Sequence, residues 1–188
     1  HGGSSGSDSG RASGRGTENQ RGVKDQFSIR EIKGEDGTDY DLIVVGGGVA
    51  GVCMALAAKR TGSRVLLIHD RDVLGGCNSS EVRVCMGGGI NLPPYEKLGS
   101  VVKQIAPIMG DPGIFGGEYY EDNRKKQAFE VACDQWSGGK DGAYRLALGE
   151  RVVDQTMEDG RITSVTTVDI HTGMRTRYRG RLFADCTG

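Results

Sequence analysis

The chain has 188 residues, a length that fits one domain of ordinary size and leaves too little for two. Its 24 Lys and Arg residues balance 25 Asp and Glu residues, which gives a formal net charge of -1 at pH 7. This balance leaves no excess positive field for nucleic acid or an anionic membrane surface, so we expect neither partner. No apolar run approaches the roughly 18–20 residues that cross a bilayer, so we expect a soluble chain, cytoplasmic or exported with its signal removed.

The cysteine pattern also excludes several classes of site. Five cysteines are present, and no two of them form a Cys-x-x-Cys pair. An odd number without such pairs argues against a disulfide scaffold, a structural zinc site and an iron–sulfur cluster. We therefore expect reduced thiols and no bound metal.

The N-terminal part of the chain contains little that a core could bury. Residues 1–22 include a single aliphatic residue, Ala12, and are otherwise rich in Gly and Ser. Such a segment cannot offset its chain entropy by burial, so we predict a disordered tail. In residues 23–39 the near-alternate spacing of Phe27, Ile29 and Ile32 predicts one short strand.

A strand, a helix and a second strand follow from residue 40. Residues 41–45 form a short, continuously apolar run, which is typical of a parallel strand buried on both faces. Residues 49–61 are rich in Ala and precede Gly62, a residue suited to end a helix, and residues 64–68 form a second apolar run. Two parallel strands so close in sequence require a helical crossover between them.

A Gly-x-Gly-x-x-Gly motif lies between the first of these strands and the helix, which is the context that a dinucleotide fingerprint needs. In that fingerprint Gly46 makes the tight turn, Gly48 lets the backbone approach a diphosphate, and Gly51 lets the helix pack closely on the strand. The helix begins at Val49 and Ala50, where free N–H groups and the positive end of the helix dipole attract phosphate. The motif therefore predicts binding of an ADP-containing cofactor, against the alternative of a glycine-rich turn without a ligand.

The end of the second strand offers three candidates for contact with the adenosine. An acidic residue about 20 positions after the motif begins is expected to hydrogen-bond the ribose, and we select Asp70. His69 is the alternative, either as an adenosine contact or as a strand-end histidine capped by backbone. Arg71 suits a 2′-phosphate, which keeps NADP open as a ligand.

The rest of the chain divides into an insertion and a group of strands. Residues 84–142 contain loops, an amphipathic helix beginning at Pro93 and a longer helix over about 118–136. We expect the basic triplet at 124–126 to form a solvated face rather than a phosphate site. Beyond the insertion, 144–148 reads as a strand. Turns then separate three further strands, 152–157, 162–169 and 175–178, at the spacing of a β-meander.

Two stretches of the sequence resemble a known family. The run at 69–83, His-Asp-Arg-Asp-Val-Leu-Gly-Gly-Cys-Asn-Ser-Ser-Glu-Val-Arg, is similar to the segment after the second strand of FAD-dependent oxidoreductases related to the flavoprotein component of heterodisulfide reductase. The final run at 181–188, Arg-Leu-Phe-Ala-Asp-Cys-Thr-Gly, resembles a strand of FAD-binding domains that follows a meander. The resemblance implies an α/β, Rossmann-like FAD-binding domain over residues 40–188, with a mostly parallel sheet, a β-meander and the helical and loop insertion at 84–142.

The resemblance also implies roles for particular residues. Gly75 and Gly76 would lie against the cofactor diphosphate and ribityl chain, the backbone of Val152 would contact adenine, and Thr187 and Gly188 would pass near the centre of the cofactor. Asparagine is the usual residue at position 77 in this family, and a cysteine stands there in this chain.

The implied function is that of an FAD-dependent oxidoreductase whose flavin accepts hydride from an unidentified small molecule. Glu81 and Arg83 would lie toward the flavin and, on an extended segment, would point the same way, which makes them the candidates for orienting a substrate or handling a proton. Neither the substrate domain nor the last glycine segment of such flavoproteins follows Gly188, so we expect an incomplete domain that needs a further domain or a partner chain. The alternatives are a non-catalytic flavin-binding fragment and an NAD(P)-binding domain of an oxidoreductase.

Overall fold

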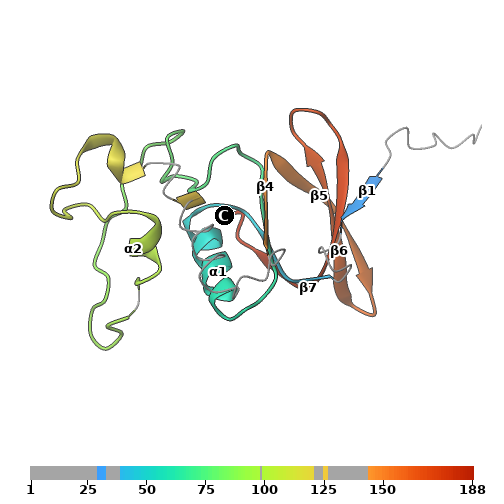
Figure 1. Cartoon of the computed structure of the whole chain (residues 1–188), viewed down its shortest axis with the longest axis horizontal. Coiled ribbons are helices and arrows are strands. Elements are labelled where there is room, and N and C mark those ends of the chain that lie inside the picture. Colours follow the sequence, from blue (N-terminus) through green and yellow to red (C-terminus); the bar gives the residue numbers. More distant parts are fainter. Residues whose placement is uncertain (1–28, 33–38, 98, 121–124, 127–143) are drawn as a thin grey trace, which may run out of the picture.

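The computed structural model describes residues 29–32, 39–97, 99–120, 125–126 and 144–188 (Figure 1). The tail predicted at 1–22 lies outside the described residues, as does most of the helix predicted at 118–136. Within the described part of the chain, no helix is long and apolar enough to cross a membrane.

A parallel sheet forms the centre of the fold. Its strands β2 (Tyr40–Val45), β3 (Val65–His69) and β4 (Tyr144–Leu148) pair in parallel, in the spatial order β4-β3-β2. The helix α1 (Val49–Arg60) makes the crossover from β2 to β3, as the sequence predicts. All five residues of β3 are buried, which explains why its sequence is continuously apolar rather than alternating.

The strand β7 (Arg175–Asp185) connects this central sheet to the meander. Its first half pairs antiparallel with β6 (Arg161–Asp169), which pairs in turn with β5 (Glu150–Glu158). Its second half pairs in parallel with β2. The predicted strand at 175–178 and most of the final run at 181–188 therefore form one continuous strand.

The short strand predicted near residue 30 is confirmed as β1 (Ile29–Ile32), which pairs in parallel with the first half of β7. It extends the meander and does not join the central sheet. The predicted β-meander is likewise present, because β5, β6 and β7 pair antiparallel in chain order.

The insertion between β3 and β4 contains little regular structure among its described residues. The amphipathic helix predicted from Pro93 is wrong, because the helix α2 covers only Val102–Ile105. A 3-10 turn, η1, spans Gly116–Tyr120. Much of the segment extends beyond the far side of α1 from the sheet (Figure 1). Ile105 and the adjoining Ala106 are nevertheless buried, since they pack into the same cluster as α1.

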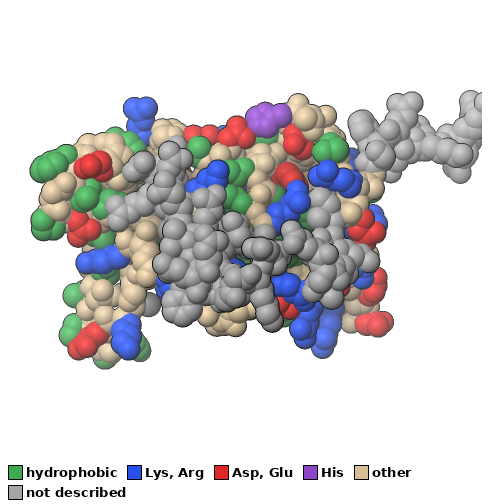
Figure 2. All heavy atoms as spheres, viewed as in Figure 1, with side chains coloured by type: hydrophobic (Ala, Val, Ile, Leu, Met, Phe, Trp, Pro, Cys, Tyr) green, Lys and Arg blue, Asp and Glu red, His purple; other side chains and the backbone are tan. Residues whose placement is uncertain are grey.

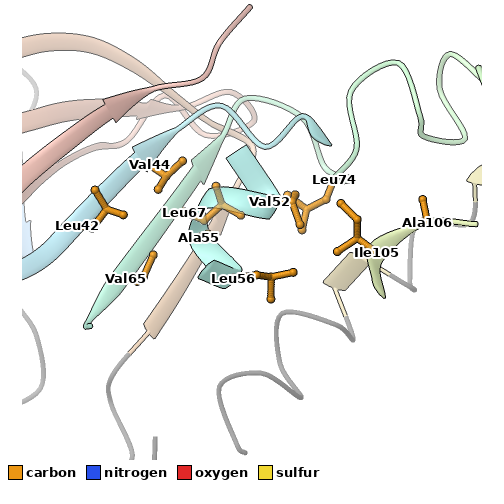
Figure 3. Packing of buried hydrophobic residues seen from close by; sticks show 10 residues of the cluster. All are labelled: Leu42, Val44, Val52, Ala55, Leu56, Val65, Leu67, Leu74, Ile105 and Ala106. Atoms are coloured by element: carbon orange, nitrogen blue, oxygen red, sulfur yellow. The ribbon is translucent and has the colours of Figure 1, made fainter. Parts of the chain in front are cut away.

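Two apolar clusters cover the two faces of the central sheet. On one face α1 packs its small and branched side chains onto β2 and β3, and Figure 3 shows these side chains directed toward one another. On the other face the meander covers the sheet, with Tyr178 and Val165 packed against Ile43, Leu66 and Ile68. Each fully buried branched side chain contributes about 1.5–3 kcal/mol relative to exposure. On the face shown in Figure 2, basic and acidic side chains are both present over the described residues, in keeping with the balanced charge.

Candidate functional site

A cavity of about 200 Å³ lies at the carboxyl ends of β2, β3 and β7. The chain leaves β2 toward α1 and β3 on one side, while β7 pairs with β2 on the other side, so this edge is the switch point of the sheet. Ligands of open α/β sheets bind at such a point. The cavity is lined by Val45, Gly46, Gly48, Ile68, His69, Asp70, Gly76, Glu150, Arg151, Val152, Cys186 and Thr187.

Two glycines of the predicted fingerprint are required by packing within the chain. Gly46 has φ +105°, and a Cβ on it would overlap the backbone of Cys186. Its N–H donates to the carbonyl of Ile68 at 2.8 Å, so the turn is tied to the end of β3. A Cβ on Gly51 would overlap the carbonyl oxygen of Gly46, because the first turn of α1 lies directly on this turn. These contacts agree with the tight turn and the close helix packing expected from the motif.

Gly48 is different, because no contact with the described residues requires a glycine there. Its φ of -65° and ψ of 179° suit any residue, and no heavy atom of the described residues lies within 4 Å of the position that its Cβ would take. The space in front of Gly48 is part of the cavity. Val49 and Ala50 form the first turn of α1 beside it, and that turn carries no acidic residue to oppose an anion. The arrangement is a cradle of main-chain atoms that a side chain at position 48 would fill.

The Gly-Gly pair at 75 and 76 completes this cradle. The N–H of Gly75 donates to the carbonyl of Gly47 at 2.8 Å, and Gly75 forms an isolated bridge with Gly48. A Cβ on Gly76 would lie 3.3 Å from the Cα of Gly48, so the two backbones flank the same space. Gly76 lines the cavity, while Gly75 supports the turn from behind.

A buried lysine stands behind the Gly-Gly pair. Lys125 is fully buried, and a Cβ on Gly75 would lie 2.5 Å from its Cε. The prediction that the basic triplet forms a solvated face is therefore wrong for Lys125, although Lys126 is exposed. The third member, at position 124, lies outside the described residues.

Of the candidates at the end of β3, the structure brings some to the cavity and leaves Arg71 away from it. Asp70 lines the cavity, and its Oδ2 lies 3.3 Å from Nη2 of Arg151, which also lines it. Arg71 is exposed and is absent from the cavity lining, and its carbonyl accepts a hydrogen bond from the N–H of Gly149 at 3.0 Å. The position suggested for a 2′-phosphate is therefore not brought to this cavity. Val152 follows Arg151 in the lining, where an adenine contact is expected.

His69 is fixed by the glycine turn. The N–H of Gly47 donates to its Nδ1 at 3.0 Å, and a Cβ on Gly47 would lie 2.6 Å from the ring. Burial lowers the pKa of His69, partly opposed by the charge of Asp70, so the ring is neutral at pH 7 with its hydrogen on Nε2. The 3.8 Å approach of Nδ1 to Asp70 is accordingly not an ion pair. Nε2 is buried, and no described residue meets strict hydrogen-bond geometry with it, although a hydrogen bond with the Val73 backbone acts on the pKa of the ring.

A polar network that sequence reasoning missed supports the start of β5. Glu150 accepts hydrogen bonds from the hydroxyl of Thr167 at 2.6 Å and from that of Tyr178 at 2.8 Å. Burial, followed by the negative charge of Glu150, raises the pKa of Tyr178, which is fully buried. The guanidinium of Arg145 lies 5.6 Å from the centre of the tyrosine ring. The only signal in the sequence is that these residues occupy predicted strands, and the pairing of those strands has no local signature.

The candidates for substrate contact do not form the predicted pair. The N–H of Arg83 donates to the carbonyl of Ser79 at 2.8 Å, and Arg83 has φ +62°, so the segment is a turn rather than an extended strand. Glu81 and Arg83 are both exposed, and the argument that alternate residues point the same way does not apply. The Nε of Arg83 donates to the carbonyl of Ser80 at 3.1 Å.

At the end of β7, Thr187 lines the cavity and donates to Oδ1 of Asp185 through its hydroxyl at 2.7 Å and its N–H at 3.0 Å. These bonds lower the pKa of Asp185. The last residue, Gly188, is exposed, has φ +81° and is not in the lining. The hydroxyl and the N–H of Thr187 are thus both used by its own turn.

The sequence comparison decides which proteins share this arrangement. Residues 41–188 match the family described as FAD dependent oxidoreductase. The chain belongs to this family. Its cofactor is therefore FAD, and the alternative of an NAD(P)-binding domain is not supported.

The chain is also similar in sequence to individual curated proteins. The chain is 29% identical over 121 residues to the aerobic glycerol-3-phosphate dehydrogenase of Bacillus subtilis, a match covering 61% of this chain and 19% of that enzyme. It is 42% identical over 81 residues to the tRNA uridine 5-carboxymethylaminomethyl modification enzyme MnmG of Treponema pallidum, covering 42% of this chain and 11% of the relative. The chain thus spans a small part of the curated relatives it matches.

A solved structure supports the fold. Mycobacterium smegmatis Sdh1, solved in complex with UQ1, superposes with a TM-score of 0.54 at 13% identity, covering 85% of this chain and 34% of that one. The expected α/β, Rossmann-type FAD-binding fold with a mostly parallel sheet is confirmed.

The residues present fit part of an FAD molecule. The open space at Gly48 accepts an atom group that no side chain of the described residues fills, and α1 directs its N-terminus there.

Proposed function

We propose that this chain provides the ADP-binding part of the FAD site in an oxidoreductase that acts on a small molecule. The observation that carries the proposal is the bare backbone at Gly48, which lines a cavity at the switch point of the sheet and is not required to be glycine by packing against the described residues. Bound FAD would supply the redox chemistry, because its ring accepts hydride. The described residues would bind and orient the cofactor.

We assign the diphosphate to the backbone of the glycine turn and the start of α1. Main-chain N–H groups and the helix dipole favour negative charge there without a lysine contact. Gly76 would close the opposite side of the diphosphate, with Gly75 holding the turn in place. Asp70 would accept hydrogen bonds from the ribose hydroxyls, as its position at the end of the second fingerprint strand suggests.

The remaining assignments follow the family resemblance. The backbone of Val152, which lines the cavity, would contact adenine. Thr187 and Gly188 would pass near the centre of the cofactor. Substrate contact is assigned to a further domain or a partner chain, because the match covers only 19% and 11% of the two relatives compared above.

A finer placement within the family rests on the sequence alone. The run at 69–83 resembles flavoproteins related to the flavoprotein component of heterodisulfide reductase, and we propose that the chain belongs near this group. The exposed Glu81 and Arg83 lie at the end of that run and remain candidates for contact with the substrate side.

The direct test is a visible absorption spectrum of the purified longest gene product, followed by denaturation and identification of the released nucleotide. Flavin absorption with release of FAD is expected. A preparation that stays colourless after incubation with FAD and shows no change on titration would contradict the proposal. Titration with ADP separates the ADP subsite from the flavin, because ADP is expected to compete with FAD.

A further inference from the structure

We propose that Lys125 is a positioning residue for the cofactor diphosphate, which holds the Gly-Gly pair at 75 and 76 from behind and places a positive charge there without touching the ligand. The inference rests on the proposed FAD site and adds to it a residue outside the fingerprint. It gives a role in cofactor binding to the insertion between β3 and β4, which carries Lys125.

The side chain of Lys125 gives one reason why residue 75 is glycine. A Cβ on Gly75 would lie 2.5 Å from Cε of Lys125, 2.8 Å from its Cδ and 2.3 Å from the carbonyl oxygen of Asn78. The aliphatic stem of the lysine therefore occupies space that a side chain at position 75 would need. Gly75 does not line the cavity, so its missing side chain makes room for the lysine and not for the cofactor.

The backbone of the Gly-Gly pair lies between Lys125 and the proposed diphosphate position. Gly75 forms a bridge with Gly48, and Gly76 lines the cavity beside Gly48. The ammonium group of Lys125 is one bond beyond Cε, so its charge lies close behind this backbone. The charge acts in the same sense as the main-chain N–H groups and the helix dipole at the start of α1.

Burial makes the charge of Lys125 effective through this layer of backbone. Lys125 is fully buried, so the group is screened much less by water and salt than a surface lysine would be. It also interacts with other groups of the chain, as a buried lysine requires. The glycine turn and the first turn of α1, to which we assign the diphosphate, carry no charged side chain. Lys125 supplies a charge that these residues lack.

Hydrogen bonds fasten the insertion to the segment that follows the Gly-Gly pair. Nδ2 of Asn78 donates to the carbonyl of Tyr119 at 2.9 Å, which joins this segment to the 3-10 turn η1. The hydroxyl of Ser79 donates to the carbonyl of Gly76 at 2.7 Å. Asn78 and Ser79 are both buried. The part of the insertion that precedes Lys125 is therefore held against the turn that the lysine supports.

The test uses the 188-residue chain with ADP and adenosine as probes, in titrations followed by NMR. Lys125→Met keeps the length of the stem and removes the charge, so it should bind ADP about 10-fold more weakly than wild type and adenosine equally well. A purely structural role would weaken the binding of both probes together. Lys125→Arg keeps the charge and should recover part of the ADP affinity. Lys126→Met is the matched control, because Lys126 is exposed, and it should bind both probes as wild type does.

A second measurement keeps the inference open to contradiction if Lys125→Met does not fold. In wild type with ¹³C-labelled lysine, the Cε signal of Lys125 should shift further when ADP binds than when adenosine binds. A signal that responds equally to both probes would overturn the inference. So would a folded Lys125→Met variant that binds ADP with wild-type affinity, or one that loses ADP and adenosine binding to the same extent.

The outcomes distinguish this inference from the proposed function. If wild type binds ADP and the variant results fail, only the role of Lys125 is wrong. If wild type binds neither FAD nor ADP, the proposed function fails and the role of Lys125 fails with it.

Discussion

Nη2 of Arg151 lies 3.3 Å from Oδ2 of Asp70 and joins the start of β5 to the end of β3. The two residues are 81 positions apart in sequence, and both line the cavity. Both side chains are partly exposed, so the ion pair itself adds little stability. The ion pair instead positions Asp70, because it holds the carboxylate at the rim of the proposed adenosine site.

Substitution of Asp70 by Ala tests this position. We expect Asp70→Ala to weaken ADP binding by about 1–3 kcal/mol, since hydrogen bonds to a charged group are lost. Calorimetric titration measures the change. Asp72→Ala is the control, because Asp72 pairs with His171 on the surface and is not in the cavity lining. Equal affinities for wild type and Asp70→Ala would remove Asp70 from the site.

The pH dependence of stability tests the neutral state of His69. Its folded-state pKa is lowered by burial and by Arg71, against the opposing charges of Asp70 and Glu81. The unfolded chain therefore binds more protons below its ordinary pKa of about 6.5. The stability contributed by the neutral ring is fully present above that value and is lost as pH falls through the lower, folded-state pKa.

Urea unfolding at several pH values between about 7.5 and 4.5 measures this loss. Wild type should lose more stability over the window than His69→Gln, which has no titrating ring. His171 provides a contrast of opposite sign, because Asp72 raises its pKa and any contribution would be lost as pH rises. Parallel curves for wild type and His69→Gln would show that His69 does not titrate in the fold as described.

The network at Glu150 predicts a loss of stability with little loss of binding. Tyr178→Phe removes a hydroxyl that donates to Glu150 in a buried setting, which should cost about 1–2 kcal/mol. Thermal unfolding measures the loss, and ADP titration should give an affinity within about threefold of wild type, because Thr167 still bonds Glu150. Unchanged stability would mean that the network does not support the fold.

The contrast between the adjacent lysines gives a further prediction. Lys125→Ala removes a fully buried side chain that packs on Gly75 and should destabilise the chain by about 1–3 kcal/mol. Lys126→Ala alters an exposed position and should change stability by no more than about 0.5 kcal/mol. Unfolding of both variants under the same conditions tests this contrast, and similar losses would contradict the burial described for Lys125.

The fold near the glycine turn could be predicted from the sequence because its signals are local. The apolar run of β2, the three motif glycines and the Ala-rich helix are contiguous, and each has one physical interpretation in that order. The ends of α1 were accordingly predicted to within one residue. Val152 and Thr187 were placed only by resemblance, since their approach to the cavity depends on strand pairing across the chain.

The failures arise where distant contacts decide the structure. The sequence indicates two segments, 175–178 and 181–188, because a single strand that pairs with both the meander and the central strands has no local signal. Lys125 was placed on the surface because composition favours solvent for a basic triplet, and only packing against Gly75 reveals otherwise. Glu81 and Arg83 were interpreted as extended, whereas the hydrogen bond from Arg83 to Ser79 closes a turn.

Gly48→Val tests the central claim most directly, because position 48 has ordinary backbone angles and open space in front of it. The variant should unfold at close to the wild-type temperature, while Gly51→Val, whose side chain would overlap the Gly46 carbonyl, should be destabilised.

The deciding measurement is FAD titration of wild type and Gly48→Val under the same conditions. We predict that wild type binds FAD and that the folded variant binds it more than about 100-fold less tightly, a change of about 2.7 kcal/mol. A folded Gly48→Val variant that binds FAD with wild-type affinity would contradict the account.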